Sequence, residues 1–460
     1  MQQKKLSFGE KVAYGFGDVG CNVLWALTAS VTTYFYTNVM GISAATVGIV
    51  LLLSRCFDGF SDAIIGILVD RTKSKHGKAR AWVLWMIAPF GLACILLFMV
   101  PANATEIVKA VYVFLTYNFT VTVVYTALNL PYGTMASLMT RDKDERATLN
   151  LFRMTMAPVG QVVVSALTMP LVNRLGGTQK AWIMLSVGYA LAGMIMVAIC
   201  FLGCHERENP LVAANEPAPP LKKSIGAVFQ NKYWIIVAFI FIMWGVYVAI
   251  DGTMVAYYAQ YQLGNNEYMG TLNATEKAAQ ILSIFVTAPF LHRFGKRKVA
   301  MAGSLFFLVG AVLMVMNPFS IPMLAVGNVI RGIGGGAFGL LVYSMLADTI
   351  EYGHWYTGVR NEGLLYCASS IGYKVGGGLT NAIIGFVMDA SGFDGTLAEI
   401  PGSAHDVIST LYLVVPIFVY ALIFIGCYFD KLDNIYDDVV SQLEQGKLHE
   451  RVKKQMASSK

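Results

Sequence analysis

Charged residues are scarce in this chain of 460 residues: 13% are Asp, Glu, Lys or Arg, and 56% are hydrophobic. Soluble domains carry about 25% charged residues, so this composition excludes an ordinary soluble enzyme or binding protein. Mean hydropathy is +0.57, and apolar segments of membrane-spanning length recur along the whole sequence. We therefore predict an all-α protein that crosses a membrane many times.

Cysteine and histidine are also few, at seven and six residues. The cysteines lie in or beside apolar segments without the spacing of a metal site or a disulfide framework, and the histidines lie in predicted loops or the tail. We therefore expect no cofactor and no metal beyond a bound Na⁺. The net charge of +6 comes with basic residues clustered in short loops, which is typical of membrane proteins and argues against nucleic-acid binding.

The apolar segments predict about twelve membrane spans. They cover approximately residues 12–39, 46–69, 81–101, 107–138, 149–173, 181–203, 233–262, 274–292, 299–317, 320–348, 362–389 and 407–429. The first of them contains Asp18 and lacks a convincing small-residue cleavage site. We therefore interpret it as a retained span rather than a signal peptide.

A polar, proline-containing segment, 204–232, divides these spans into two groups of six. It is predicted to be a cytoplasmic linker between an N-terminal half, 1–203, and a C-terminal half, 233–429. A polar tail, 430–460, follows, and its apolar residues recur at helical spacing, which predicts a cytosolic amphipathic helix. Two six-helix halves joined by a linker are typical of secondary transporters.

Loop charges predict the orientation in the membrane. Basic residues gather in segments 71–80 and 292–298, whereas segment 391–406 has three acidic residues and no Lys or Arg. Because short loops rich in Lys and Arg face the cytoplasm, both termini are expected there.

The most informative polar residues lie in the second predicted span. Arg55, Asp58 and Asp62 are spaced i, i+3 and i+7, so a helix places all three on one face. An ionised side chain in hydrocarbon costs about 2.5–3.5 kcal/mol on insertion scales, so such residues mark functional sites. Two carboxylates and the Ser61 hydroxyl suit a monovalent cation, and a proton needs only one carboxylate. The alternative is that Arg55 pairs with Asp58 only to hold the helix in place.

Two further groups of polar residues lie in the first half. Asp18 and Asn22 are one helical turn apart in the first span, where an acid and an amide suit sugar hydroxyls; the alternative is an Asp that bonds only a neighbour. Asn129 precedes Pro131, which predicts a helix break in the fourth span. Arg153 in the fifth span either serves the site or reaches from a helix end to the interface.

The second half contributes Lys374, near the middle of the eleventh span. A lysine at that depth is expensive unless it faces an acid, and the acids of the second span are the obvious partners. Asp251 and Arg331 are also deep, and we expect them to pair with each other or to contact substrate. Three aromatic residues near the polar faces are candidates for stacking on a sugar ring: Trp25, Tyr125 and Tyr132.

Taken together, the motifs resemble the glycoside–pentoside–hexuronide:cation symporters, a branch of the major facilitator superfamily that includes melibiose permease. The resemblance runs from Leu6 to about Phe429. It is carried by six motifs: Tyr14–Asp18, Arg55–Asp62, Asp70–Arg80, Asn129–Gly133, Ala347–Gly353 and Thr357–Gly363.

The resemblance implies a major facilitator fold of twelve helices and the import of a sugar or glycoside with Na⁺ or H⁺. It implies a cation site at Asp58 and Asp62, with Ser61 and Thr126 as further ligands. It also implies sugar contacts, which with the neighbouring Tyr125 make up our candidate set: Asp18, Asn22, Asn129, Arg153, Lys374 and Tyr125.

Six positions depart from the melibiose permease pattern, and two of them, Asp251 and Arg331, have no charged counterpart in that permease. Asn22 and Asn129 replace acids that bind galactosyl hydroxyls, and Gly133 replaces a tryptophan. The amides are more similar to the pentoside and glucuronide branches of the family. Ser61 replaces an asparagine associated with sodium use, which leaves Na⁺ and H⁺ both open.

We therefore expect a monomeric symporter that works by alternating access among membrane lipids, without covalent chemistry. Residues expected to serve structure or the cytoplasmic gate lie in the second span, directly after it, in the basic loop 71–80 and in the predicted loop 348–362: Arg55, Asp70, Arg71, Asp348, Glu351, Arg360 and Glu362. Alternatives are a lysolipid carrier of the same fold, which predicts a lateral opening, and a sugar sensor that does not transport. A membrane enzyme is the weakest, because no nucleophile–base pair appears.

Overall fold

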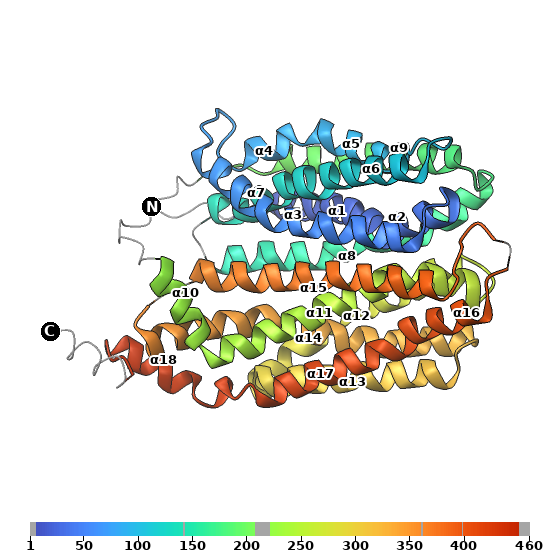
Figure 1. Ribbon diagram of the computed structural model, residues 1–460. Coiled ribbons are helices and arrows are strands. Elements are labelled where there is room, and N and C mark those ends of the chain that lie inside the picture. Colours follow the sequence, from blue (N-terminus) through green and yellow to red (C-terminus); the bar gives the residue numbers. More distant parts are fainter. Residues whose placement is uncertain (1–5, 141–142, 208–220, 360–361, 398, 450–460) are drawn as a thin grey trace. The chain divides into compact units, whose positions relative to one another are not determined.

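The computed structural model describes residues 6–140, 143–207, 221–359, 362–397 and 399–449. Helices dominate these residues (Figure 1). They are α1 (Phe8–Ala26), α2 (Thr32–Tyr34), α3 (Ala44–Arg71), α4 (Arg80–Trp85), α5 (Ile87–Leu96), α6 (Glu106–Asn118), α7 (Thr126–Met139), α8 (Lys143–Arg174), α9 (Gln179–Gly203), α10 (Leu221–Gln230), α11 (Lys232–Tyr257), α12 (Tyr268–Phe294), α13 (Lys296–Met316), α14 (Ile321–Thr357), α15 (Glu362–Ala390), α16 (Gly402–Ser409), α17 (Val415–Phe429) and α18 (Tyr436–Glu444).

Each of the twelve predicted spans falls on a helical segment of the described residues. Seven of these segments are long and apolar enough to cross a membrane by length and composition. Several spans are joined from shorter pieces by π-helical turns, as at Phe119–Tyr125 between α6 and α7. The tail forms the predicted amphipathic helix as α18, whose Val439 is buried in a cluster with Tyr233, Tyr352 and Leu432.

Two expectations about local structure were wrong. Pro131 does not break its span, because it lies inside the continuous helix α7 and removes only one main-chain hydrogen bond there. Residues 348–357 do not form a loop either, since α14 continues to Thr357 and ends before Gly358, whose φ is 70°. Residues 360–361 of the predicted loop lie outside the described residues. The extra turns of α14 are stabilised by aromatic packing, with the Tyr352 ring 4.7 Å from that of Tyr233.

The chain forms two compact units. The first comprises residues 1–214, 249–277 and 378–412, and in it α1 packs against α8 and α9. The second comprises residues 215–248, 278–377 and 413–460, and in it α13 packs against α14 and α17. The division of the sequence into two six-helix halves stays a prediction.

Glycines allow the backbones of α13 and α14 to approach closely. A Cβ atom on Gly334 would lie 2.3 Å from the carbonyl oxygen of Gly303, and one on Gly310 would lie 2.5 Å from that of Gly327. Real Cβ atoms do not approach backbone so closely, so only glycine fits these four positions. Small residues at such spacing are typical of helix packing in membranes.

Gly334→Val is therefore expected to destabilise the second unit by about 3 kcal/mol, because the new side chain overpacks against α13. The measurement is the apparent melting temperature of the purified protein in detergent. Gly188→Val on α9 is the matched control, since a Cβ there meets no atom within 4 Å. Equal melting temperatures for the two variants would contradict the packing argument.

In each of the two basic segments, 71–80 and 292–298, backbone N–H groups donate hydrogen bonds to a carboxylate at the start of a helix. Glu206 accepts hydrogen bonds from the backbone N–H groups of Lys78, Ala79 and Arg80 at 2.8, 2.8 and 2.6 Å, at the start of α4. In the second unit, Asp433 accepts one from Arg297 at 2.7 Å, at the start of α13. A carboxylate at a helix N-terminus is favourable because the unpaired N–H groups carry partial positive charge.

Glu206→Ala is expected to free the loop 72–80, because three charge-assisted hydrogen bonds are lost. Tryptic cleavage within this loop should become at least about tenfold faster, since 1.4 kcal/mol already corresponds to a factor of ten. Cleavage is followed by mass spectrometry of the native protein. Glu444→Ala, at an exposed position of α18, is the control and should leave the cleavage rate unchanged.

Candidate functional site

The first cluster lies where α3 meets the start of α7. Arg55, Asp58 and Ser61 are buried, with 9%, 3% and 8% of their surface exposed. The Arg55 Nη1 atom lies 3.7 Å from Asp58 Oδ2, and the Thr126 hydroxyl donates to Asp58 Oδ1 at 3.3 Å. The Ser61 hydroxyl donates to the Asp58 carbonyl oxygen at 2.8 Å and lies 3.4 Å from Thr126 Oγ1. The helical spacing on α3 thus assembles a guanidinium, a carboxylate and one hydroxyl, and the start of α7 adds the Thr126 hydroxyl.

The second cluster lies between α1 and α8. Asp18 is 5% exposed, and its Oδ1 atom lies 3.5 Å from Arg153 Nε. Asn22 donates from its amide to the Asp18 carbonyl oxygen at 2.9 Å and accepts from Gln161 Nε2 at 2.7 Å. Arg153 is therefore tied to α1 by an ion pair. Gly160 allows this approach, since a Cβ there would lie 2.6 Å from the Val19 carbonyl oxygen.

Aromatic rings border both clusters. The Arg153 guanidinium lies 5.2 Å from the centre of the Tyr132 ring, and Tyr132 stacks on Tyr14 at 4.6 Å. The Arg55 guanidinium lies 5.2 Å from the Trp25 ring, whose centre is 5.8 Å from that of Tyr125. Trp25 follows Asn22 by one turn of α1. Helix α1 therefore contributes to the Asp18–Arg153 cluster and contacts the Arg55–Asp58 cluster.

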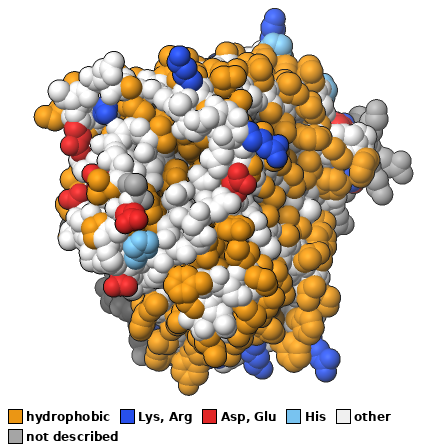
Figure 2. Space-filling view, turned by 90° about the vertical axis from the view of Figure 1, so that its right-hand side faces the viewer, with side chains coloured by type: hydrophobic (Ala, Val, Ile, Leu, Met, Phe, Trp, Pro, Cys, Tyr) orange, Lys and Arg blue, Asp and Glu red, His pale blue; other side chains and the backbone are white. Residues whose placement is uncertain are grey.

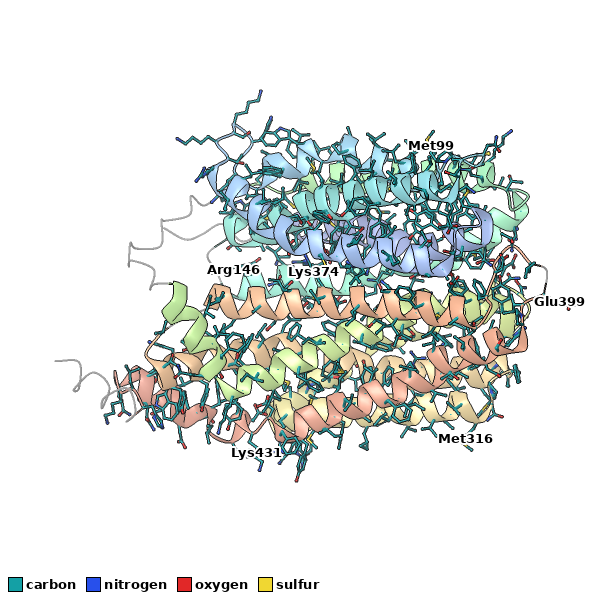
Figure 3. The ribbon with its side chains drawn as sticks, viewed as in Figure 1. Met99, Arg146, Met316, Lys374, Glu399 and Lys431 are labelled. Carbon is teal, nitrogen blue, oxygen red and sulfur yellow. The ribbon has the colours of Figure 1, made fainter. Side chains whose placement is uncertain are left out.

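Other candidate residues lie elsewhere in the described chain. Asp62 and Asn129 are half-buried on α3 and α7, and no hydrogen bond of the described residues links Asn129 to the Asp18 cluster. Lys374, half-buried on α15, belongs to the second unit (Figure 3), so its approach to the acids of α3 stays a prediction. Asp251 and Arg331 belong to different units, so their pairing also stays a prediction.

The contacts of Arg331 within the second unit are nevertheless defined. It is 1% exposed, donates to the Tyr247 hydroxyl at 3.1 Å, and its guanidinium lies 4.9 Å from the centre of the Phe307 ring. These aromatic contacts were not evident from the sequence, because they join α11, α13 and α14 at positions far apart in the chain.

The structure describes the contacts or exposure of some candidate gate residues and not of others. Asp348 accepts from Lys296 Nζ at 2.6 and 2.7 Å, which ties α14 to the start of α13. Glu351 is half-buried on the same helix, and Arg71 is exposed at the end of α3. Arg360 lies outside the described residues, as do the side chains of Asp70 and Glu362.

Sequence reasoning missed Gln161. It is a single amide in an apolar stretch of α8, and its eight-residue distance from Arg153 was the only available signal. The structure gives a reason for glycine at position 133: a Cβ atom there would lie 3.4 Å from Arg153 Nη1. The absence of a side chain at this position leaves room for the arginine.

Residues 13–434 match the model of a family described as MFS/sugar transport protein. The chain belongs to this family. It is a polytopic membrane transporter with the major facilitator fold, and not an enzyme. The resemblance that the sequence motifs carry is therefore confirmed.

Two relatives and one solved structure illustrate the similarity. The isoprimeverose transporter of Lactiplantibacillus pentosus is 30% identical over 451 residues, which cover 97% of this chain and 93% of the relative. The inner membrane symporter YicJ of Escherichia coli is 29% identical over 459 residues, which cover 97% of each protein. The nucleoside transporter NupG has a TM-score of 0.62 at 16% identity and covers 91% of this chain and 99% of its own. At that identity NupG supports the fold alone.

Proposed function

We propose that this transporter imports a sugar or glycoside together with Na⁺ or H⁺, with the cation at Asp58 and the sugar at the Asp18–Arg153 cluster. One observation carries the proposal. The buried Asp58 on α3 accepts from the Thr126 hydroxyl with its carboxylate and from the Ser61 hydroxyl with its main-chain carbonyl oxygen. A second buried acid, Asp18, forms an ion pair one turn of α1 away from Asn22. Buried acids in a membrane protein are costly and are typical of coupled transport.

The hydroxyl of Thr126 suits a cation site because its proton has two acceptors. Asp58 Oδ1 and the Val121 carbonyl oxygen both lie 3.3 Å from Thr126 Oγ1, and one proton can be donated to only one of them at a time. A cation on Asp58 makes donation to Val121 favourable and turns the lone pairs of Thr126 towards the ion. Asp62 is proposed as a further carboxylate ligand, and Ser61 as a further hydroxyl.

The Asp18 cluster suits a sugar because it offers donors and acceptors side by side. Arg153 donates from a planar guanidinium, Asp18 accepts, and the amides of Asn22 and Gln161 can do both. Tyr132 is fully buried and holds Arg153 in place, whereas the half-buried Tyr125, beside Trp25, is proposed to offer an apolar face to the C–H face of a sugar ring. We include Asn129 and Lys374 as further contacts in conformations that bring them to the sugar.

We propose that cation binding is coupled to sugar binding through the charge of Asp58 and through helix α1, which contacts both clusters. A cation neutralises Asp58 and weakens its attraction for Arg55, whose guanidinium contacts Trp25 on the helix that carries the sugar cluster. The halves 1–203 and 233–429 then rock about the loaded site. Gly378, one turn after Lys374, packs against Arg55, since a Cβ there would lie 2.7 Å from Arg55 Cβ. This contact supports the proposed approach of Lys374.

We further propose a monomer in a bacterial inner membrane, in contact with lipids and with both termini and the linker 204–232 in the cytoplasm. The basic loops support this orientation by the positive-inside rule. The ion pair of Lys296 with Asp348 and the loop 72–80 held by Glu206 are proposed to help close the cytoplasmic side, and Glu351 and Arg71 are proposed as further gate residues.

Uptake into proteoliposomes tests the proposal. Tritiated isoprimeverose, xylose, methyl β-galactoside and methyl β-glucuronide are supplied under an imposed Na⁺ gradient, an imposed proton gradient or neither. Accumulation of at least one sugar above its external concentration, under one gradient only, is expected and identifies the ion. Equilibration without accumulation under either gradient would overturn symport, and no uptake of any sugar would overturn the substrate class.

A further inference from the structure

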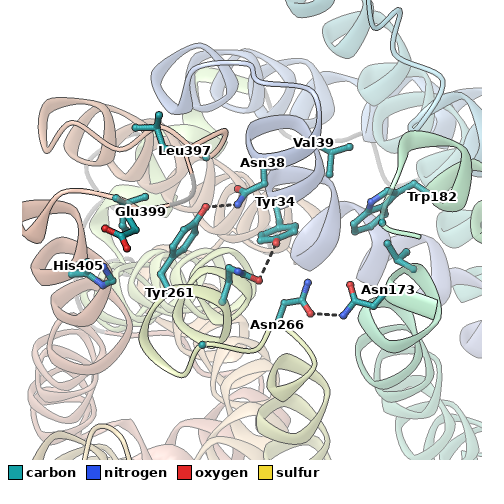
Figure 4. Close-up of a pocket in the computed structure, with 16 residues that line it drawn as sticks. Tyr34, Asn38, Val39, Asn173, Trp182, Tyr261, Asn266, Leu397, Glu399 and His405 are labelled. Carbon is teal, nitrogen blue, oxygen red and sulfur yellow. Dashed lines mark hydrogen bonds between the residues drawn. The ribbon is translucent and has the colours of Figure 1, made fainter. Parts of the chain in front are cut away.

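A cavity of about 760 Å³ lies in the first unit, remote from the Asp18 cluster (Figure 4). Tyr34 and Asn38 line it from the end of the first span, and Asn38 follows Asp18 by twenty residues, about 30 Å at 1.5 Å per helical residue. The cavity reaches the surface, since Glu399 is exposed, and it extends inward to Trp182, which is 2% exposed. Nothing in the proposed transport site uses these residues.

Trp182 carries a hydrogen-bond donor that the protein leaves unused. Its indole Nε1–H is buried, and no acceptor for it exists among the described residues. The ring is held in place by stacking on Phe98, with centroids 5.6 Å apart, and by Phe35 at 5.3 Å. A buried donor without an acceptor costs about 1–3 kcal/mol, and the ring that carries it lines the cavity, so a ligand oxygen that reaches the N–H from the cavity would be stabilising.

Amides and phenols supply the rest of the lining. Asn173 donates to Asn266 at 2.8 Å, Tyr34 donates to Gln260 at 3.3 Å, and Asn38 donates to the Tyr261 hydroxyl (Figure 4). Each amide has both a donor and an acceptor, and these bonds use only the donor of Asn173 and only the acceptor of Gln260. Amide groups with an unused donor or acceptor are suited to sugar hydroxyls, and the aromatic rings are suited to the apolar face of a sugar ring.

The charge around the cavity limits the kind of sugar. The described residues that line it include no Lys or Arg, whereas Glu399 lines it and Asp394 adjoins it. Acidic side chains gather on this face of the molecule (Figure 2). Hydrogen bonds from the backbone and hydroxyl of Thr396 lower the pKa of Asp394, so it stays ionised. Such a rim disfavours a hexuronate and favours a neutral sugar.

We propose that this cavity is a second sugar-binding site, which holds a neutral glycoside or pentoside on the path to the Asp18–Arg153 cluster. The Trp182 indole N–H donates to a sugar oxygen, and the amides of Asn173, Gln260 and Asn266 bind further hydroxyls. This inference rests on the proposed function, because it assigns the same sugar to two places in one chain.

The test combines equilibrium dialysis with uptake, using the same four tritiated sugars. The wild-type chain is expected to bind two molecules of a transported neutral sugar. Trp182→Phe, which keeps the stacking but removes the N–H, should raise the half-saturation constant of uptake about fivefold with the maximal rate retained. Asn173→Ala should act in the same direction. Trp85→Phe, at an exposed position of α4, is the matched control and should change neither quantity.

The outcomes separate this inference from the proposed function. Uptake that is intact with one bound sugar per chain would overturn the second site and leave symport standing. The second site is likewise overturned if Trp182→Phe and Asn173→Ala behave as Trp85→Phe, which would indicate that these residues only hold the ends of the helices together. No binding and no uptake of any sugar would overturn both proposals.

Discussion

Asp58→Asn is expected to abolish cation-driven accumulation, with a fall of at least about 100-fold in the accumulation ratio. Breaking a buried charged pair costs about 3–5 kcal/mol, and 1.4 kcal/mol is a factor of ten. The asparagine keeps the volume and one acceptor for Thr126 but removes the charge that binds the cation and faces Arg55. Accumulation is measured in proteoliposomes under the gradient that drives the wild-type protein.

Sugar binding to the Asp58→Asn variant, measured by equilibrium dialysis, should survive, because the Asp18 cluster is separate. Asp62→Asn is expected to have the same effect on accumulation if this half-buried acid is a ligand, as we propose. Asp389→Asn, at an exposed position of α15, is the control. Full accumulation in either α3 variant would remove that residue from the cation site.

Arg153→Gln is expected to reduce both sugar binding and uptake at least about 100-fold. It leaves Asp18 buried without its cation, and removing one partner of a buried ion pair costs about 3–5 kcal/mol. The loss should appear in binding without any gradient, which distinguishes it from the loss caused by Asp58→Asn. Binding is measured by equilibrium dialysis and uptake in the same preparation.

The double variant Asp18→Asn with Arg153→Gln separates folding from function. A neutral pair avoids the unpaired charge, so its melting temperature should recover towards that of the wild-type protein while sugar binding stays lost. Recovery of binding together with stability would show that the pair is only structural. Unaltered binding in Arg153→Gln itself would remove this arginine from the sugar site.

The two clusters differ in how much of them the sequence could reveal. Arg55, Asp58 and Ser61 share one face of one helix, so their meeting follows from helical periodicity alone. Thr126 lies 65 residues after Ser61, and only the family resemblance pointed to it. For Gln161 the only signal was its eight-residue distance from Arg153, and a single amide in an apolar helix predicts no partner until the packing of that helix is known.

Two local predictions were wrong for one physical reason. Pro131 and the charged start of the segment 348–362 are local signals for the end of a helix, but α7 and α14 continue through them. Tertiary packing overrides such preferences, here through aromatic contacts such as that of Tyr352 with Tyr233. The helix irregularity near Pro131 lies instead at Phe119–Tyr125.

The amino-acid sequence by itself determined the membrane environment, the all-helical class and the acidic face of α3, because hydrophobicity, length and helical periodicity act within one segment. Only the tertiary structure decided that Arg153 pairs with Asp18, that Thr126 reaches Asp58, and that the buried Trp182 indole lies in the wall of a cavity. These contacts join residues far apart in the chain, and their formation depends on close helix packing at residues such as Gly160.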